Sequence, residues 1–243
     1  MTGSKADIIA QLRRDIISLQ GLKTVTKNTA ANALPGPIQN AFPNASFPLG
    51  AIHEFISTGM EDAAATSGFV AGLIASMMQA NGALIWISAC RTIFPPALQS
   101  FGISPDRIIF IDLAREKEIM WAMEEALKCK GLSAVIGEMK ELSFTASRRL
   151  QLAVEKSCVT GFVLRRDPKS INTTACITRW QITAEQSEQA DGMPGVGFPC
   201  WNVVLQKVRN GYPGAWKLAF VAGRFRHISP AVAIPLLQKK KTG

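Results

Sequence analysis

One stretch of the chain sets its architecture: Ile52-His53-Glu54-Phe55-Ile56-Ser57-Thr58-Gly59-Met60-Glu61-Asp62-Ala63-Ala64-Ala65-Thr66-Ser67-Gly68-Phe69. An apolar strand runs into a glycine, then into small residues, and then into a helix. A strand followed by a glycine and a helix N-terminus places backbone N–H groups around an anion, as phosphate-binding loops do. The pattern therefore predicts the scaffold of a nucleotide-binding protein.

The same stretch lacks the side chains with which such a loop binds phosphate. A working loop carries a lysine that reaches the terminal phosphates and an adjacent Ser or Thr hydroxyl that holds magnesium. Ala65-Thr66-Ser67 stands in place of Gly-Lys-Thr, and Glu61 and Asp62 would repel a polyphosphate. We therefore predict a degenerate nucleotide loop, kept for its shape and made of Gly59, Glu61, Asp62, Thr66, Ser67 and Gly68.

The two acidic positions that an ATPase of this architecture needs are also altered. One acid at the end of a buried strand helps to hold magnesium, and a second carboxylate polarises the attacking water. The strand 133–138 does end in Glu138, although a glutamate at a strand end is more often merely solvated. The strand that runs into Cys90 and Arg91 ends without an acid. Cys90 and Glu138 are predicted to be degenerate acid positions, and no catalytic residue and no cofactor is expected.

Outward from this stretch, strands alternate with helices along the chain. We expect strands at 51–56, 83–88, 107–112, 133–138 and 160–165, and helices at 66–80, 93–101, 116–129 and 145–157. This alternation is typical of a parallel sheet with helices on both faces. After Asp167, consecutive strands follow at 176–183, 200–208 and 216–222, with an exposed loop at 186–199. The predicted fold class is α/β, a P-loop NTPase fold with a mostly parallel central sheet and C-terminal antiparallel strands.

The N-terminal region is predicted to be an appendage of this core. Residues 5–20 have an apolar stripe at helical spacing, which indicates an amphipathic helix with Ile8, Leu12, Ile16 and Leu19 on one face. Residues 21–48 are rich in Asn, Pro, Gly and Ala and are interpreted as a linker. The helix either docks on a partner or folds back on its own domain. The core then spans 49–225, and 226–243 forms a basic tail.

The amino-acid composition of the chain excludes some classes of protein and favours others. The chain has 243 residues, 47% of them hydrophobic and 19% charged, which excludes a disordered chain. A formal charge of +9 favours nucleic acid or acidic partners, or reflects scattered solvated lysines. Five separated cysteines without C-x-x-C spacing indicate reduced thiols in the cytoplasm, and with only His53 and His227 no metal site is predicted. The uncharged stretch Ala63 to Cys90 is interpreted as core rather than as a membrane span, because Asn81-Gly82 divides it into a helix and a strand.

Clustered basic residues are candidate contacts to DNA or to a partner. Arg148 and Arg149 lie near the start of the helix 145–157, where the helix dipole disfavours cations; ion pairing with Glu141 or Glu155 is the alternative. Further basic residues alternate with aromatic ones late in the chain, a composition that suits single-stranded DNA. Tryptophans in a hairpin more often pack across strands. These later candidates are Arg165, Arg166, Arg179, Lys207 and Arg209.

Several motifs in order resemble the ImuA proteins, RecA-like accessory factors of the bacterial inducible mutagenesis cassette. The motifs are Pro48-Leu49-Gly50-Ala51-Ile52-His53-Glu54, Trp121-Ala122-Met123-Glu124-Glu125-Ala126-Leu127, Ser147-Arg148-Arg149-Leu150-Gln151-Leu152-Ala153, Thr178-Arg179-Trp180 and Pro213-Gly214-Ala215-Trp216. The resemblance covers about residues 45 to 222 and implies a RecA-like core with degenerate Walker motifs. On that core, Gly59 to Gly68 corresponds to the P-loop, Cys90 to the catalytic glutamate and Glu138 to the magnesium-side aspartate.

The resemblance also implies a function. It suggests a non-catalytic adaptor in SOS-induced, error-prone translesion DNA synthesis, with an ImuB-like polymerase homologue, a DnaE-type polymerase and RecA as partners. Single-stranded DNA, self-association and association with the nucleoid are further alternatives. An ATPase with an unusual loop and a SulA-like cell-division inhibitor are the competing interpretations.

Overall fold

The computed structural model describes residues 34–78, 82–188 and 197–228. The amphipathic helix expected at 5–20, with Ile8, Leu12, Ile16 and Leu19, lies outside the described residues, as does most of the expected basic tail. Within the described part of the chain, no helix is both long and apolar enough to cross a lipid bilayer.

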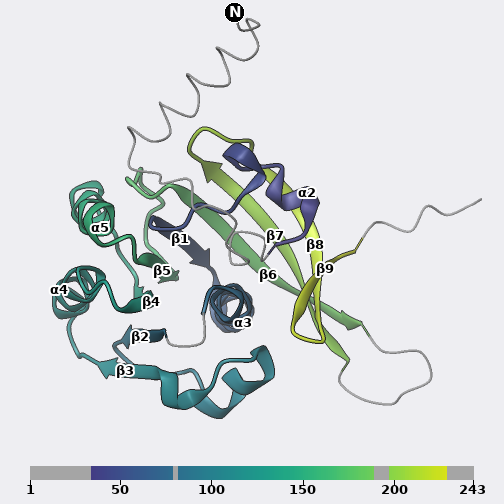
Figure 1. The fold of residues 1–243 in the computed structure, drawn as a ribbon, viewed down its shortest axis with the longest axis horizontal. Helices are drawn as coiled ribbons and strands as arrows, with labels where there is room; N and C mark the ends of the chain where they lie inside the picture. Colours follow the sequence, from purple (N-terminus) through teal and green to yellow (C-terminus); the bar gives the residue numbers. More distant parts are fainter. Residues whose placement is uncertain (1–33, 79–81, 189–196, 229–243) are drawn as a thin grey trace, which may run out of the picture.

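A single nine-stranded sheet organises the described residues, in the order β3-β2-β4-β5-β1-β6-β7-β8-β9 (Figure 1). Neighbouring strands from β3 to β6 are parallel, and those from β6 to β9 are antiparallel. The expected α/β class, with a mostly parallel sheet and antiparallel C-terminal strands, is confirmed. The strands are β1 Ile52–Ser57, β2 Ala83–Ser88, β3 Ile108–Asp112, β4 Leu132–Met139, β5 Thr160–Arg166, β6 Thr178–Glu188, β7 Phe198–Val208, β8 Gly214–Val221 and β9 Arg224–His227.

The helices lie on both faces of the sheet, as the alternation predicted. Helices α4 (Glu116–Leu127) and α5 (Phe144–Ser157) cover one face, and α3 (Gly59–Met77) lies on the other, where β7 to β9 curve around it (Figure 1). The segment expected as a helix at 93–101 is instead a 3-10 helix, η3 (Pro95–Phe101). Two prolines open it, and Gly102 with φ 88° ends it after seven residues.

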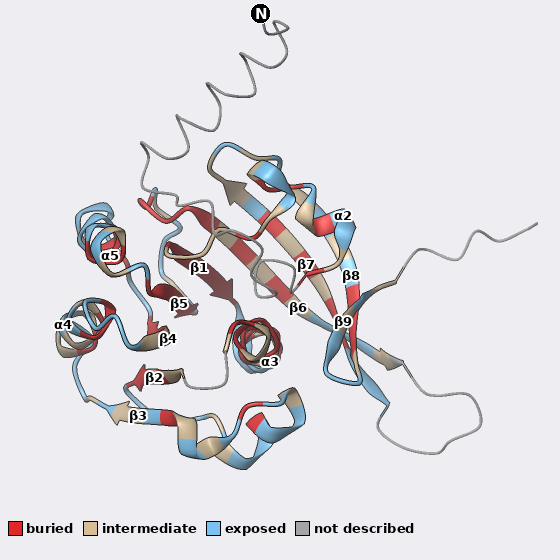
Figure 2. Ribbon diagram, viewed as in Figure 1, coloured by how far each residue is buried: buried red, intermediate tan, exposed pale blue. Residues whose placement is uncertain are grey.

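Two hydrophobic layers hold these elements together. On the α3 side, aromatic rings pack together. The centroid of the Phe69 ring of α3 lies 6.1 Å from that of Trp180 and 6.0 Å from that of Trp201. On the other side, α4 and α5 bury Met123 and Leu150 against the sheet. Helix α3 is buried around most of its circumference (Figure 2), which explains why the stretch after Asp62 carries no charge.

Residues 34–48, expected to be part of a linker, instead belong to the folded domain. Leu34, Ile38, Phe42 and Phe47 are all buried, and a short helix α2 (Gly36–Gln39) lies among them. The Phe42 ring lies 5.9 Å from Trp180, and Phe47 stacks on His53 at 4.4 Å. The prolines and glycine that suggested a linker begin two short helical turns, and the apolar residues between them cover the sheet.

The core also extends beyond the boundary expected at 225. Strand β9 pairs antiparallel with β8, with Phe225 opposite Phe220. Both rings pack against α3 at Gly72, where an added Cβ atom would meet Phe225 at 2.7 Å and Phe220 at 3.0 Å. The absence of a side chain at Gly72 lets the last hairpin approach the helix.

Candidate functional site

The junction between β1 and α3, predicted to be a phosphate loop, is not a loop. Strand β1 ends at Ser57, α3 begins at Gly59, and Thr58 alone connects them. The residues from Gly59 to Gly68 form the first turns of a continuous α-helix. A run of alanines favours helix, whereas a loop that turns several N–H groups towards an anion needs more glycines. The prediction of a phosphate loop at this position is therefore wrong.

The N-terminus of α3 is bound by a carboxylate of the same chain. The backbone N–H of Gly59 donates to Asp167 Oδ1 at 2.7 Å. Asp167 follows β5, has φ 46°, and donates its own N–H to Ser57 O at 3.0 Å. Glu61 and Asp62 in the first turn add two further negative charges. A helix N-terminus attracts an anion, and here the protein supplies it.

Thr66 and Ser67 stand at the positions where a phosphate loop would bind magnesium, but both residues are buried in the packing around α3. Ser67 Oγ donates to the carbonyl of Ala63 at 2.9 Å. Thr66 is buried, and among the described residues its Oγ1 has no hydrogen-bond partner. A Cβ atom at Gly68 would meet the Phe101 ring at 3.2 Å and the Trp201 ring at 3.4 Å. Neither hydroxyl is exposed to bind a metal.

Glu138 is engaged at both of its oxygens. Trp86 Nε1 donates to Oε1 at 2.7 Å, and Arg166 pairs with Oε2 at 2.9 Å. Burial raises the pKa of the Glu138 carboxyl, and Arg166 and the Trp86 hydrogen bond oppose that rise. Cys90, at the other acid position, is exposed just beyond β2. In the described part of the chain, no group of three or more His, Cys, Asp or Glu residues could hold a metal ion.

A pocket of about 680 Å³ lies beside the first turns of α3, between that helix, the segment around η3 and the start of β7. Its lining is mostly apolar, with polar side chains from Ser67, Thr92, Lys140, Arg166 and Asp167. Such a lining suits an apolar group better than a polyphosphate. The apolar side chains that line it include Met60, Ala64, Phe94, Leu98, Phe101 and Trp201.

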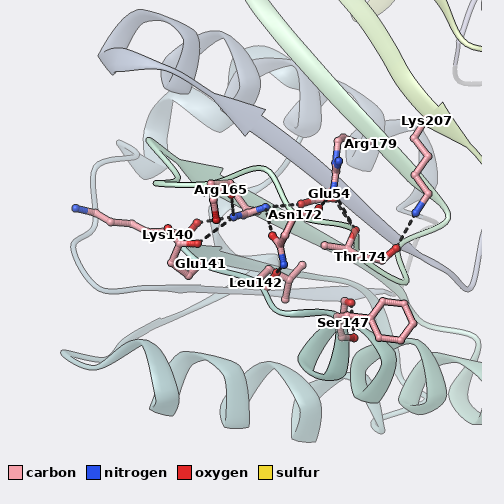
Figure 3. Close-up of polar contacts among 12 residues, drawn as sticks. Glu54, Lys140, Glu141, Leu142, Ser147, Arg165, Asn172, Thr174, Arg179 and Lys207 are labelled. Carbon is pink, nitrogen blue, oxygen red and sulfur yellow. Dashed lines mark hydrogen bonds and ion pairs between the residues drawn. The ribbon is translucent and has the colours of Figure 1, made fainter.

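A buried ion network centred on Glu54 lies on the α5 side of the sheet (Figure 3). Glu54 has no exposed surface, and its Oε1 accepts from Arg165 at 2.9 Å. Its Oε2 accepts from Arg179 Nε and from the Thr174 hydroxyl, both at 2.8 Å. Arg165, also fully buried, pairs in addition with Glu141 at 3.3 Å. Each buried charge thus has an opposite charge and hydrogen bonds around it, as buried ions require.

Four of the basic residues predicted to contact DNA or a partner donate to backbone carbonyls of the loop between β5 and β6. Arg165 donates to Ser170 O at 2.9 Å, and Arg179 donates to Asn172 O at 2.5 Å. Lys207 donates to Thr174 O at 2.7 Å, and burial lowers the pKa of its ammonium. Arg209 lies 3.4 Å from Ala175 O. Arg165 has no surface to offer DNA.

Arg148 and Arg149 are exposed on α5, where both form ion pairs. Arg148 lies 3.8 Å from Glu155, one of the two acids expected as alternative partners. Arg149 pairs at 2.5 Å with Glu124 of α4 rather than with Glu141. Trp180 is buried and Trp216 packs on the core, so the aromatic residues near the basic clusters serve mainly in packing.

Sequence reasoning missed a second buried polar site, at His53. Its Nε2 lies 2.8 Å from Pro48 O, which can only accept, so Nε2 carries the hydrogen. The Thr178 hydroxyl then donates to Nδ1 at 2.8 Å and accepts from Trp180 Nε1 at 2.8 Å. Burial lowers the pKa of His53 to about 3. The signal for both missed sites was the polar pair His53-Glu54 inside an apolar strand.

No model of a known protein family matches the chain. Protein ImuA of Caulobacter vibrioides, in two strains, is 34% identical over 193 residues, which is 74% of this chain and 79% of that protein. Cell division inhibitor SulA of Photorhabdus laumondii is 30% identical over 96 residues, which is 40% of this chain and 54% of that protein.

Proposed function

The chain belongs to the ImuA family, and from this membership we propose that it acts as a non-catalytic adaptor in SOS-induced, error-prone translesion DNA synthesis. The observation that carries the non-catalytic part is the start of α3. Its first N–H is bound by Asp167, and the adjoining helical turns bury the hydroxyls that a nucleotide site would use. In this proposal the domain binds no nucleoside triphosphate and acts through contacts with other macromolecules.

The proposed partners are an ImuB-like polymerase homologue, a DnaE-type polymerase and RecA. The apolar pocket beside α3 supports a role in contacts with proteins, because Met60 and Phe94 at its surface are 90% and 68% exposed. In this proposal residues 5–20 form a tethered helix that docks on a partner. Purified ImuB-like protein should bind the full chain and lose affinity for a chain that lacks residues 1–20. Equal binding by both chains would remove the helix from the proposal.

An ATPase is the competing enzymatic function, and isothermal titration separates the two. The adaptor proposal expects no heat of binding when ATP and magnesium are titrated into the full chain. Tight binding followed by release of phosphate would replace the proposal with an ATPase.

A SulA-like role in cell division is a second candidate, because 96 residues of the chain are 30% identical to a cell division inhibitor. Co-sedimentation with the polymerised tubulin-like division protein tests it. The adaptor proposal expects the chain to stay in the supernatant. Single-stranded DNA binding has weaker support, since Arg165, Arg179 and Lys207 are engaged inside the domain.

A further inference from the structure

A groove runs along the outer side of α4 and α5, on the face of the sheet opposite to α3 (Figure 1). It contains two depressions of about 510 Å³ each, and the Glu124–Arg149 ion pair lines both. The first depression is lined by Glu116, Lys117, Met120, Trp121, Glu141, Ser143 and Ala146, and the second by Lys128, Lys130, Leu152, Ala153, Lys156 and Ser157. Both follow the seam between the helices.

Large apolar side chains are exposed in this groove. Trp121 lines the first depression and is 64% exposed, and Leu152 lines the second and is 45% exposed. The buried residues of the two helices are turned towards the sheet (Figure 2), and Phe144 at the start of α5 is the one other large apolar side chain of these helices that is exposed. A tryptophan with one side unburied is the kind of side chain that dominates the affinity of protein interfaces.

The second depression is strongly basic. Four cationic side chains line it, from Lys128, Lys130, Arg149 and Lys156, against one carboxylate, from Glu124. Glu124 is already paired with Arg149 at 2.5 Å, and Lys128 pairs with Glu125 at 2.6 Å as well as lying 3.8 Å from Glu124. Lys130 and Lys156 take part in none of the ion pairs of the described residues. The surface therefore presents excess positive charge beside an apolar side chain, Leu152.

We propose that the α4–α5 groove docks an acidic amphipathic segment of a partner protein. Apolar side chains of that segment cover Trp121 and Leu152, and its carboxylates lie over Lys128, Lys130 and Lys156. Amphipathic segments bind grooves between helices in this way, and complementary charge steers their encounter. The inference rests on the adaptor function and names the surface through which the adaptor works.

Nucleic acid fits the groove less well than such a segment does. Three carboxylates and two cationic side chains line the first depression, so its net charge is negative and disfavours a phosphate backbone. The carboxylates are those of Glu116, Glu124 and Glu141, and the cations those of Lys117 and Arg149. Trp121 lies among these acids. A polypeptide can place apolar or basic side chains there and carboxylates over the second depression, whereas DNA carries the same charge along its whole length.

The test uses the full chain and purified ImuB-like protein, with affinity measured by biolayer interferometry. Trp121→Ala with Leu152→Asp, and separately Lys128→Glu with Lys156→Glu, should each weaken binding at least about tenfold. Lys217→Glu with Arg224→Glu makes the same charge change on the exposed β8–β9 hairpin and should bind as the wild type does. Circular dichroism melting confirms that each variant folds. In the charge variant, affinity should also depend less on salt.

A photo-crosslinking residue in place of Leu152, which lines the basic second depression, provides a second readout in the full chain. The cross-linked partner peptide should have apolar residues at helical spacing and an excess of Asp and Glu. Wild-type affinity in both groove variants, or a cross-linked peptide with net positive charge, would overturn the groove while leaving the adaptor function standing. Loss of labelled single-stranded DNA binding in the lysine variant, with partner binding unchanged, would also overturn it. Failure of the wild-type chain to bind ImuB-like protein would remove the proposed function and the groove with it.

Discussion

The carboxylate of Asp167 lies 2.7 Å from the backbone nitrogen of Gly59, so the first N–H of α3 is bound by a residue that follows β5. Strands β1 and β5 are neighbours in the sheet, with Ser57 opposite Arg166. The position of an anion at this helix end is therefore taken by a side chain that the fold itself brings there. Asp167 holds φ 46°, a backbone conformation that few residues adopt and that Asn and Asp tolerate best.

Replacing Asp167 should destabilise the fold without creating a nucleotide site. Asp167→Ala removes the acceptor of the Gly59 N–H and should lower the free energy of unfolding in urea by about 1 kcal/mol. Asp167→Asn keeps an acceptor oxygen and should cost less. Neither variant should bind ATP with magnesium in a calorimeter, since the first turns of α3 carry no lysine. If Asp167→Ala binds ATP tightly, the carboxylate alone was excluding the nucleotide.

Removing the charge of Glu54 should be among the most damaging single changes. Glu54→Gln removes the carboxylate that pairs with both Arg165 and Arg179, and leaves Glu141, at 3.3 Å, as the remaining opposite charge of buried Arg165. Breaking a buried ion pair costs roughly 3–5 kcal/mol. The free energy of unfolding in urea measures this loss. Glu185→Gln is the matched control, because its pair with Lys217 is exposed and should contribute less than about 1 kcal/mol. Similar costs for the two variants would contradict a structural role for the Glu54 network.

The stability of the fold should fall in mild acid because His53 must stay neutral. Burial lowers its pKa from the ordinary histidine value of 6.5 to about 3, so below about pH 6.5 only the unfolded chain takes up the proton. The contribution of neutral His53 to the free energy of unfolding is fully present above about pH 6.5 and is lost as the pH falls towards 3. Between pH 7 and pH 5 the loss should be about 2 kcal/mol. His53→Gln should flatten this part of the profile, and an unchanged slope would show that His53 is not the cause.

A methyl group at Gly72 should loosen the C-terminal hairpin. Gly72→Ala places a Cβ atom 2.7 Å from Phe225, and overpacking of this kind costs about 1–3 kcal/mol. Hydrogen exchange should accelerate in β9. Gly36→Ala is the control, since an added Cβ there meets nothing within 4 Å. Equal protection of β9 in both variants would mean that the hairpin does not depend on this contact.

The sequence was sufficient for the large elements of the fold. The long alternation of strands and helices predicted the parallel sheet, and the consecutive late strands predicted its antiparallel end. The short β9 was missed because Arg224–His227 alternates charged and aromatic residues in only four positions. Residues 34–48 were misread because prolines and glycine suggest a linker, although Ile38 and Phe42 are core residues.

The candidate site was harder to predict because it depends on contacts between distant segments. The missing lysine was visible in the sequence, but the occupation of the helix end by Asp167 requires β5 to lie beside β1. Arg165 and Arg179 were interpreted as surface cations. Their local sequence does not show that both side chains bind Glu54 from the two strands that flank β1. Charge patterns along a chain do not distinguish a solvated arginine from a buried one.

Thr58, as the lone residue between β1 and α3, leaves the connection without slack. A nucleotide-binding protein of this architecture has a glycine-rich segment at this place, whose backbone N–H groups surround the phosphates. Here the whole connection is a single residue, and Asp167 already accepts from the N–H of Gly59. The start of α3 is therefore expected to keep the same conformation whether or not ATP is present in solution.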